Sequence, residues 1–209
     1  MIFGADPFID AVAWAADHAL CSRSDELEMA FLAMPFPARE DLAHLRRIEI
    51  DPGDPVPLRI LRISEDSPAL GRFRFDEDGK PHIVAPVIQR GEWVDLVAFA
   101  SKPERPAMTL FGVAWALGAD ALTVPMHPEP VPVMRHPVDW LVARGAGACF
   151  VDWTAARVHL AEFEHAPLEA EDLEHGTHLR RALQPRPVRA PRITTSAPRR
   201  GAVSREAAA

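Results

Sequence analysis

Apolar residues in the first fifty positions recur every three to four residues, the spacing of helices that bury one face. The pattern predicts three helices, the first opening at Pro7, the second spanning Ser24–Met34 and the third running from Pro37 to about Ile48. Ser24 is expected to cap the second helix, because its hydroxyl can accept a hydrogen bond from an N–H of the first turn. Helices of this kind serve as scaffold more often than as functional elements.

After a turn of aspartate, proline and glycine at 51–55, apolar and polar residues alternate, which is the period of a strand. Four strands are predicted, at 56–63, 72–75, 81–88 and 93–100. The short connections, including a hairpin turn from Asp76 to Gly79, favour an antiparallel meander. Because the strands are rich in apolar residues, helices are expected to cover at least one face.

The stretch from Pro106 to Gly118 contains no charged residue and has no polar face. It predicts a helix that is buried nearly all round and ends at Gly118. Trp115 is then a core residue, with stacking on a ligand as the alternative.

The second half alternates between the two periods. Strands are predicted at 131–134, 148–151 and 163–168, and helices at 137–144, 154–160 and 169–183. In the last helix Leu173, Gly176, Leu179 and Leu183 are expected to face inward. The whole pattern predicts a single α+β domain from residue 1 to 183, with helices over 1–50, a central mixed and largely antiparallel sheet, and an α/β-like C-terminal half.

From residue 184 to 209 no apolar period survives, and proline alternates with arginine, serine and alanine. Such a segment buries too little apolar surface to offset its ordering entropy, so disorder is predicted. From Arg180 to Glu206 arginines outnumber acids eight to one, with Glu206 as the acid, whereas residues 1–179 carry 15 basic and 29 acidic side chains. The eight are Arg180, Arg181, Arg186, Arg189, Arg192, Arg199, Arg200 and Arg205.

A cationic arm of about +7 on a body of about −14 predicts an anionic partner. Nucleic acid is the leading candidate, contacted without sequence reading because the arm lacks aromatic residues that could stack on bases. An acidic protein surface, including that of a second copy of the chain in a homo-oligomer, is a further candidate. A tail that only aids solubility, its arginines reflecting GC-rich codons, remains open as well. The function expected is that of a non-enzymatic accessory or binding protein.

The densest group of ionisable residues lies between His159 and His178. His175 and His178 are three residues apart on a predicted helix, and Asp172 lies one turn earlier, so together they could bind a divalent metal. With Asp152 at the end of a buried strand, the alternative function is a metal-dependent hydrolase of phosphodiesters. The simpler interpretation makes Asp152 a helix cap and the two histidines part of a solvated helix face.

Other function classes lack their motifs. The chain has no GxxxxGK[ST] loop, no dinucleotide fingerprint and no GxSxG, and His127 to Glu129 lacks the PCxxC motif that a zinc deaminase needs. Cys149 in its apolar run is expected to be a buried, inert thiol. No cofactor is expected. An acidic start, and a longest apolar run of about thirteen residues where a membrane span needs roughly twenty, predict a cytoplasmic protein without membrane contact.

Four short stretches together combine tryptophans with apolar runs: Asp95 to Phe99, Trp115 to Gly118, Pro137 to Leu141 and Val151 to Trp153. They resemble stretches of uncharacterised proteins encoded near prophages and integrated elements of GC-rich bacteria. The resemblance covers roughly residues 90 to 183 and rests on tryptophans and apolar runs. It implies a mobile-element setting, assigns no activity, and identifies no functional residue.

Overall fold

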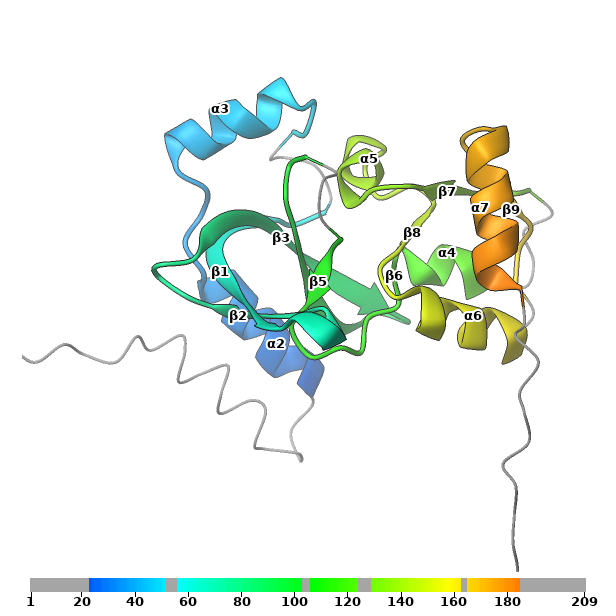
Figure 1. The fold of residues 1–209 in the computed structure, drawn as a ribbon. Coiled ribbons are helices and arrows are strands. Elements are labelled where there is room, and N and C mark those ends of the chain that lie inside the picture. The colour runs from blue at the N-terminus through cyan, green and yellow to red at the C-terminus, as the bar shows by residue number, and fades with distance from the viewer. Residues whose placement is uncertain (1–22, 52–55, 103–105, 124–128, 163–164, 185–209) are drawn as a thin grey trace, which may run out of the picture.

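The structure, a computed structural model, describes residues 23–51, 56–102, 106–123, 129–162 and 165–184. These residues form an α+β fold in which a small barrel lies beside a second sheet flanked by helices (Figure 1). The helix predicted after Pro7 and the segment 185–209 lie outside the described residues. None of the helices in the described ranges combines the length and the apolar character that crossing a membrane requires.

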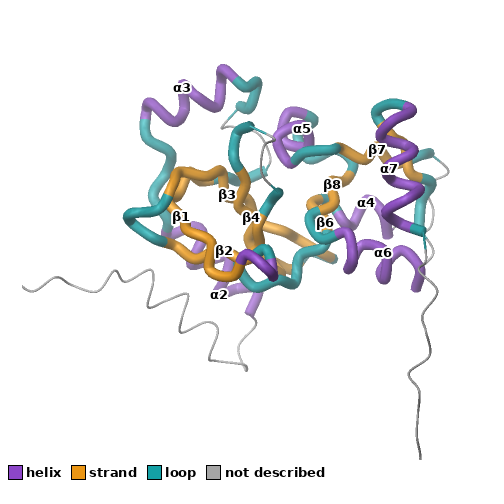
Figure 2. The backbone as a smooth tube through the Cα atoms, viewed as in Figure 1, coloured by secondary structure: helices purple, strands orange, loops and turns teal. Residues whose placement is uncertain are grey.

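The barrel has five strands that close in the order β1-β2-β5-β4-β3 (Figure 2). They are β1 (Arg59–Ser67), β2 (Arg72–Phe75), β3 (Lys80–Gln89), β4 (Glu92–Phe99) and β5 (Met108–Thr109), with a short 3-10 helix, η1 (Pro68–Leu70), between β1 and β2. Four of these strands match predicted ones. Alternation is seen in β1 and β2, whereas β3 buries every residue from His82 to Val87, because both of its faces are covered.

The predicted meander is wrong in one respect. The turn at Asp76 to Gly79 is present, with the Gly79 N–H donating to the Asp76 carbonyl over 2.9 Å. The strands that it joins, however, both pair antiparallel with β1 and not with each other in the described pairings. Strand β1 pairs with β3 through its first half and with β2 through its second, and β5 closes the gap between β2 and β4.

The helix predicted from Pro106 to Gly118 is also wrong. Strand β5 occupies its start, and the chain then wraps around the carboxylate of Asp95 on β4. The two oxygens accept five backbone N–H groups at 2.8 to 3.1 Å. The donors are Leu96, Leu110, Phe111, Val113 and Ala114. These bonds replace the helical ones, because a backbone N–H that donates to Asp95 is no longer free to donate along a helix.

Two N-terminal helices adjoin the barrel. Helix α2 (Arg23–Ala33) buries Leu27 and Phe31 in the cluster that fills the barrel, and α3 (Arg39–Arg47) buries Leu45 in the neighbouring cluster. Ser24 lies within α2 rather than capping it, and its hydroxyl accepts the N–H of Trp93 on β4. The hydroxyl thus ties the helix to the barrel.

The second sheet has the order β6-β8-β7-β9, in which β6 is antiparallel to β8 and the other neighbours are parallel. Its strands are β6 (Ala116–Leu117), β7 (Val131–Met134), β8 (Ala148–Phe150) and β9 (Leu168–Ala170). Its helices are α4 (Ala119–Thr123), α5 (Pro137–Val142), α6 (Trp153–Glu162) and α7 (Leu173–Leu183). The alternation predicted for the second half is therefore confirmed, with β9 and α7 starting later than expected.

That late start reverses two predicted orientations in α7. Leu173, expected inside, is 81% exposed, whereas His175, expected on the wet side, is 2% exposed. Leu179 is buried as predicted, at 4% exposure. The apolar spacing alone could not locate the first turn of α7, because the residues just before the helix are polar and fit either the helix or the preceding segment.

One buried cluster spans both halves of the fold. It joins Val87 and Phe99 of the barrel to Leu117 of β6 and to Trp140 of α5. Helix α6 packs instead with the cluster on the opposite side of the second sheet, which includes Val133 and Phe150. The barrel and one face of the second sheet therefore share a core.

Candidate functional site

The carboxyl ends of three parallel strands meet at one edge of the second sheet. Arg135 and His136 follow β7, Asp152 follows β8, and Glu171 follows β9. The chain leaves β7 through α5 toward β8 and then returns through α6 to β9 on the other side of β7. Connections that depart in opposite directions leave a crevice at this edge, the usual ligand site of open α/β sheets.

A cavity of about 350 Å³ occupies this edge. It is lined by Arg135, His136, Trp153, Glu174, His175 and His178. The rings of His178 and Trp153 pack edge to face, with a centroid distance of 4.9 Å and the planes at 87°. Two of the predicted site residues, His175 and His178, therefore line one cavity.

Arg135 holds the two acids that follow β9. Its guanidinium lies 2.6 Å from Asp172 Oδ1 and 3.4 Å from Glu171 Oε2, and its backbone N–H donates to Glu171 Oε1. Asp172 also caps α7, because Oδ1 accepts the His175 N–H over 2.8 Å. The His175 N–H and the Arg135 cation both keep the pKa of the Asp172 carboxyl below its ordinary value.

His175 is the buried group of this site. Its Nδ1 accepts the backbone N–H of Glu171 over 3.3 Å, which fixes the neutral ring with its proton on Nε2. Burial lowers the pKa of the imidazole, outweighing the opposing effect of the Glu171 carboxylate. The ring is therefore a structural acceptor that joins α7 to the end of β9.

The alternative metal site finds no support here. Within the described ranges no group of three or more histidine, cysteine, aspartate or glutamate side chains is arranged to hold a metal. Asp172 is engaged by Arg135 and by the α7 backbone, and His175 uses Nδ1 for Glu171. Asp172, His175 and His178 lie in sequence as ligands would, but the structure gives the first two other partners.

Asp152 is a helix cap, as the simpler interpretation has it. Its Oδ1 accepts the N–H groups of Thr154 and Ala155 at 2.8 and 3.1 Å. It lies on a polar cavity of about 410 Å³ together with Arg72, whose buried Nε has no hydrogen-bond partner. Cys149 is 0% exposed, so the predicted burial of this thiol is confirmed, and burial raises its pKa to about 12.

The structure also locates the start of the predicted cationic arm. Arg180 and Arg181 lie in the last turn of α7, and both are exposed. The other six arginines, from Arg186 to Arg205, fall outside the described residues.

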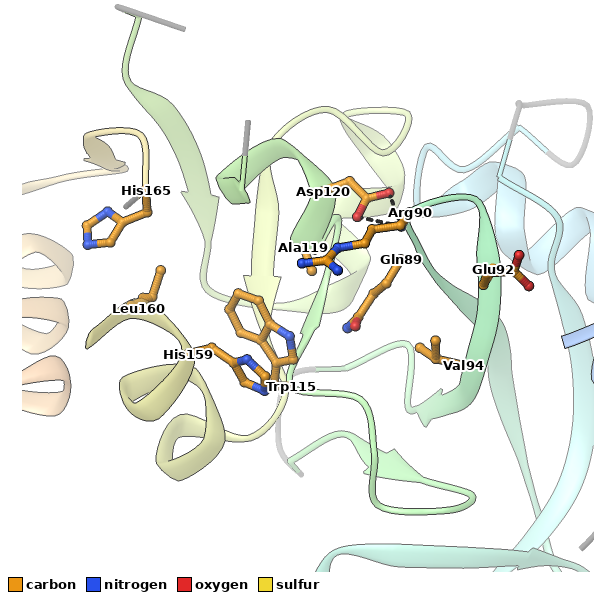
Figure 3. Close-up of a pocket in the computed structure, with 10 residues that line it drawn as sticks. All are labelled: Gln89, Arg90, Glu92, Val94, Trp115, Ala119, Asp120, His159, Leu160 and His165. Atoms are coloured by element: carbon orange, nitrogen blue, oxygen red, sulfur yellow. Dashed lines mark hydrogen bonds between the residues drawn. The ribbon is translucent and has the colours of Figure 1, made fainter. Parts of the chain in front are cut away.

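A further cavity of about 410 Å³ was not anticipated from the sequence. It lies between the β3–β4 hairpin of the barrel and the helices of the second sheet (Figure 3). Gln89 and Arg90 enter it from the hairpin, whereas Trp115 and His159 form its floor with their rings stacked at 5.0 Å and 16°. Trp115 is 3% exposed, as predicted for a core residue, and it also lines the cavity. The available signal was the pair Arg90 and Gly91 between two strands, which marks a two-residue turn.

The chain was compared with protein-family models, with curated proteins and with solved structures, and no match was found in any of the three. The resemblance to prophage-associated proteins therefore stays a prediction.

Proposed function

We propose that this protein is a non-enzymatic accessory protein, of the kind that mobile elements encode, and that it binds an anionic polymer through the arginines at its C-terminal end. Nucleic acid is the partner proposed, contacted at its phosphates without sequence reading. The observation that carries the proposal is the separation of charge along the chain, about +7 from Arg180 to Glu206 against about −14 before it.

The way in which α7 ends supports the proposal. Leu179 anchors the helix in the core of the second sheet, while Arg180 and Arg181 beside it are exposed. Cations at a helix C-terminus are favoured by the helix dipole, and here they are also free to meet a phosphate. The arginine-rich segment therefore begins from a fixed point on the folded body.

The acidic body affects how such binding would work. Its charge repels a polyanion, so the arm must carry the whole affinity, and the affinity must fall steeply with salt. The expected slope of log K against log salt is about −0.9 for each phosphate contacted in duplex DNA.

The test measures binding of a labelled duplex by the full chain across a series of salt concentrations. A variant replaces the six arginines beyond α7 by glutamine, and a matched variant replaces them by lysine. The positions are Arg186, Arg189, Arg192, Arg199, Arg200 and Arg205. We expect the glutamine variant to lose binding and most of the slope, and the lysine variant to keep both, because phosphate contacts need charge rather than a guanidinium.

The second part of the test is a variant in which residues 184 to 209 are deleted. Unchanged affinity after deletion, or no binding by the intact chain near physiological salt, contradicts the proposal. Equal binding of duplexes of different sequence is expected, and a strong preference for one sequence contradicts the absence of base reading.

A further inference from the structure

The β3–β4 hairpin turns in an unusual way. Arg90 and Gly91 form its two-residue turn, with φ of 55° and 81°. A turn with positive φ at both positions favours asparagine followed by glycine, and arginine at the first position costs local conformational energy. Strain of this kind persists only where the surroundings hold it, and it gathers at functional sites.

Asp120 of α4 stabilises this strained turn through a hydrogen bond to its backbone. Both of its carboxylate oxygens lie 2.8 Å from the Arg90 backbone N–H. The contact joins the tip of a barrel hairpin to a helix of the second sheet, across a sequence separation of thirty residues. It fixes the backbone and leaves the guanidinium of Arg90 directed into the cavity (Figure 3).

Two hydrogen-bond donors of the hairpin meet in this cavity. The Nε2 atom of Gln89 is buried and has no hydrogen-bond partner. Among the residues that the structure describes, none forms an ion pair with the Arg90 guanidinium. Arg90 is exposed, so the buried donor is Gln89 Nε2. A buried donor without an acceptor is costly, and a ligand that supplies an acceptor here would remove that cost.

The remaining walls are apolar. Val94 and Ala119 adjoin the donors, Leu160 lies opposite, and Trp115 stacked with His159 forms the floor (Figure 3). A ligand that satisfies both regions has hydrogen-bond acceptors at one end and an apolar or aromatic body at the other. Glu92 and Asp120 at the same end add two negative charges, which disfavour a doubly charged phosphate relative to a singly charged carboxylate.

We propose that this cavity binds a small organic carboxylate with an apolar or aromatic body, with Arg90 and Gln89 as the groups that hold the carboxylate. The site does not involve the arginine-rich arm. The outcome of the carboxylate-binding test therefore neither supports nor contradicts the nucleic-acid proposal.

The test uses the full chain, uniformly labelled for NMR, with benzoate and indole-3-acetate as probes and benzamide as the neutral counterpart. We expect saturable shifts of the Trp115 indole N–H and of the Gln89 side-chain amide. Benzoate should bind about tenfold or more tightly than benzamide, since a charge-assisted bond to a guanidinium is roughly twice as strong as a neutral one.

Two variants remove the donors without disturbing the fold. In Arg90→Asn the turn gains the residue that its backbone favours, so the melting temperature should stay the same or rise while benzoate binding weakens about tenfold or more. In Gln89→Met an unpartnered donor is replaced by a side chain of similar size, again with loss of binding and no loss of stability. Arg144→Asn is the matched control, because Arg144 also has a positive φ, of 57°, and does not line the cavity.

The proposal is overturned if neither carboxylate binds saturably at about 10 mM, a range that fragment-sized ligands reach in a formed pocket. It is equally overturned if Arg90→Asn binds benzoate like the original chain, or if benzamide binds as tightly as benzoate. A large loss of stability in Gln89→Met would assign Gln89 a structural role and remove it from the site.

Discussion

Asp95 is fully buried in the wall of the barrel, and it holds five backbone N–H groups with its two oxygens. An ionised carboxylate loses its hydration on burial and needs several donors to replace it. The loop from Leu110 to Ala114 supplies four of them, so the loop takes its shape from the aspartate and the aspartate is stabilised by the loop.

Asp95→Asn should therefore be strongly destabilising. The amide has the same shape, but its NH₂ group cannot accept, and it meets N–H groups that then lack an acceptor in the core. We expect a loss of about 2 to 4 kcal/mol in the free energy of unfolding. Urea denaturation measures it, and Asp66→Asn at an exposed position of β1 is the control that should change stability by less than about 0.5 kcal/mol. A loss for Asp95→Asn as small as the control's would show that the carboxylate does not organise the loop.

At the scale of elements, α7 and β9 are joined by a titratable contact. His175 of α7 accepts the N–H of Glu171 beyond β9, and the groups that face its ring are Glu171, Arg135, Asp172 and His178. Burial keeps the pKa of the folded imidazole below its ordinary value of 6.5. Below about pH 6.5 the unfolded chain therefore binds a proton that the folded chain does not, and the free energy of unfolding falls as the pH is lowered toward the folded pKa.

This predicts a loss of stability between about pH 7 and about pH 5 that depends on His175. In His175→Asn the amide oxygen can replace Nδ1 as acceptor but does not titrate, so the difference between the two pH values should shrink. His44→Asn, in the last turn of α3, does not face the ring and should keep the original difference. Urea curves at both pH values give the comparison, and an unchanged difference in His175→Asn would contradict the neutral buried ring.

Elements differ in how far their own residues predicted them. Strands β3 and β4 follow from short apolar runs bounded by turn residues, and α6 follows from its cap at Asp152, because these signals lie within a few residues of one another. The stretch 106–118 was misassigned because residues apolar on all sides have no period that separates a buried helix from buried strands. The partner that decides it, Asp95, lies earlier in the chain.

For the whole molecule, the shared core links the barrel to the second sheet. Leu117 of β6 is fully buried in the cluster that also contains Val97 and Phe99 of the barrel and Trp140 of α5. Two halves that bury each other's apolar surface are expected to unfold together.

Leu117→Ala tests this coupling. The cavity should cost about 2 to 4 kcal/mol, and native-state hydrogen exchange should show that loss in slow amides of β3 and β4 as well as of β7 and β8. Leu160→Ala, at a partly buried position of α6 outside the shared cluster, is the comparison. A loss confined to the second sheet would mean that the barrel is stable by itself.

The candidate sites also differ in how far the sequence could predict them. The arginine-rich end could be predicted, because charge is additive along the chain and needs no fold. The cavity around Gln89 and Arg90 could not, because its walls come from a hairpin and from helices of the other sheet. The same holds for Asp172, which resembled a metal ligand until the structure placed Arg135 beside it.

The amino-acid sequence by itself determined the α+β class, most strands and helices, and the charge separation, because periodicity, turn residues and net charge act over short distances or as sums. The tertiary structure alone decided the closure of the barrel, the path of the loop around Asp95, the inward turn of His175 and the cavity at the hairpin. Each of these depends on a hydrogen bond or a packing contact between residues distant in the chain, and such contacts leave no periodic trace in the residues that make them.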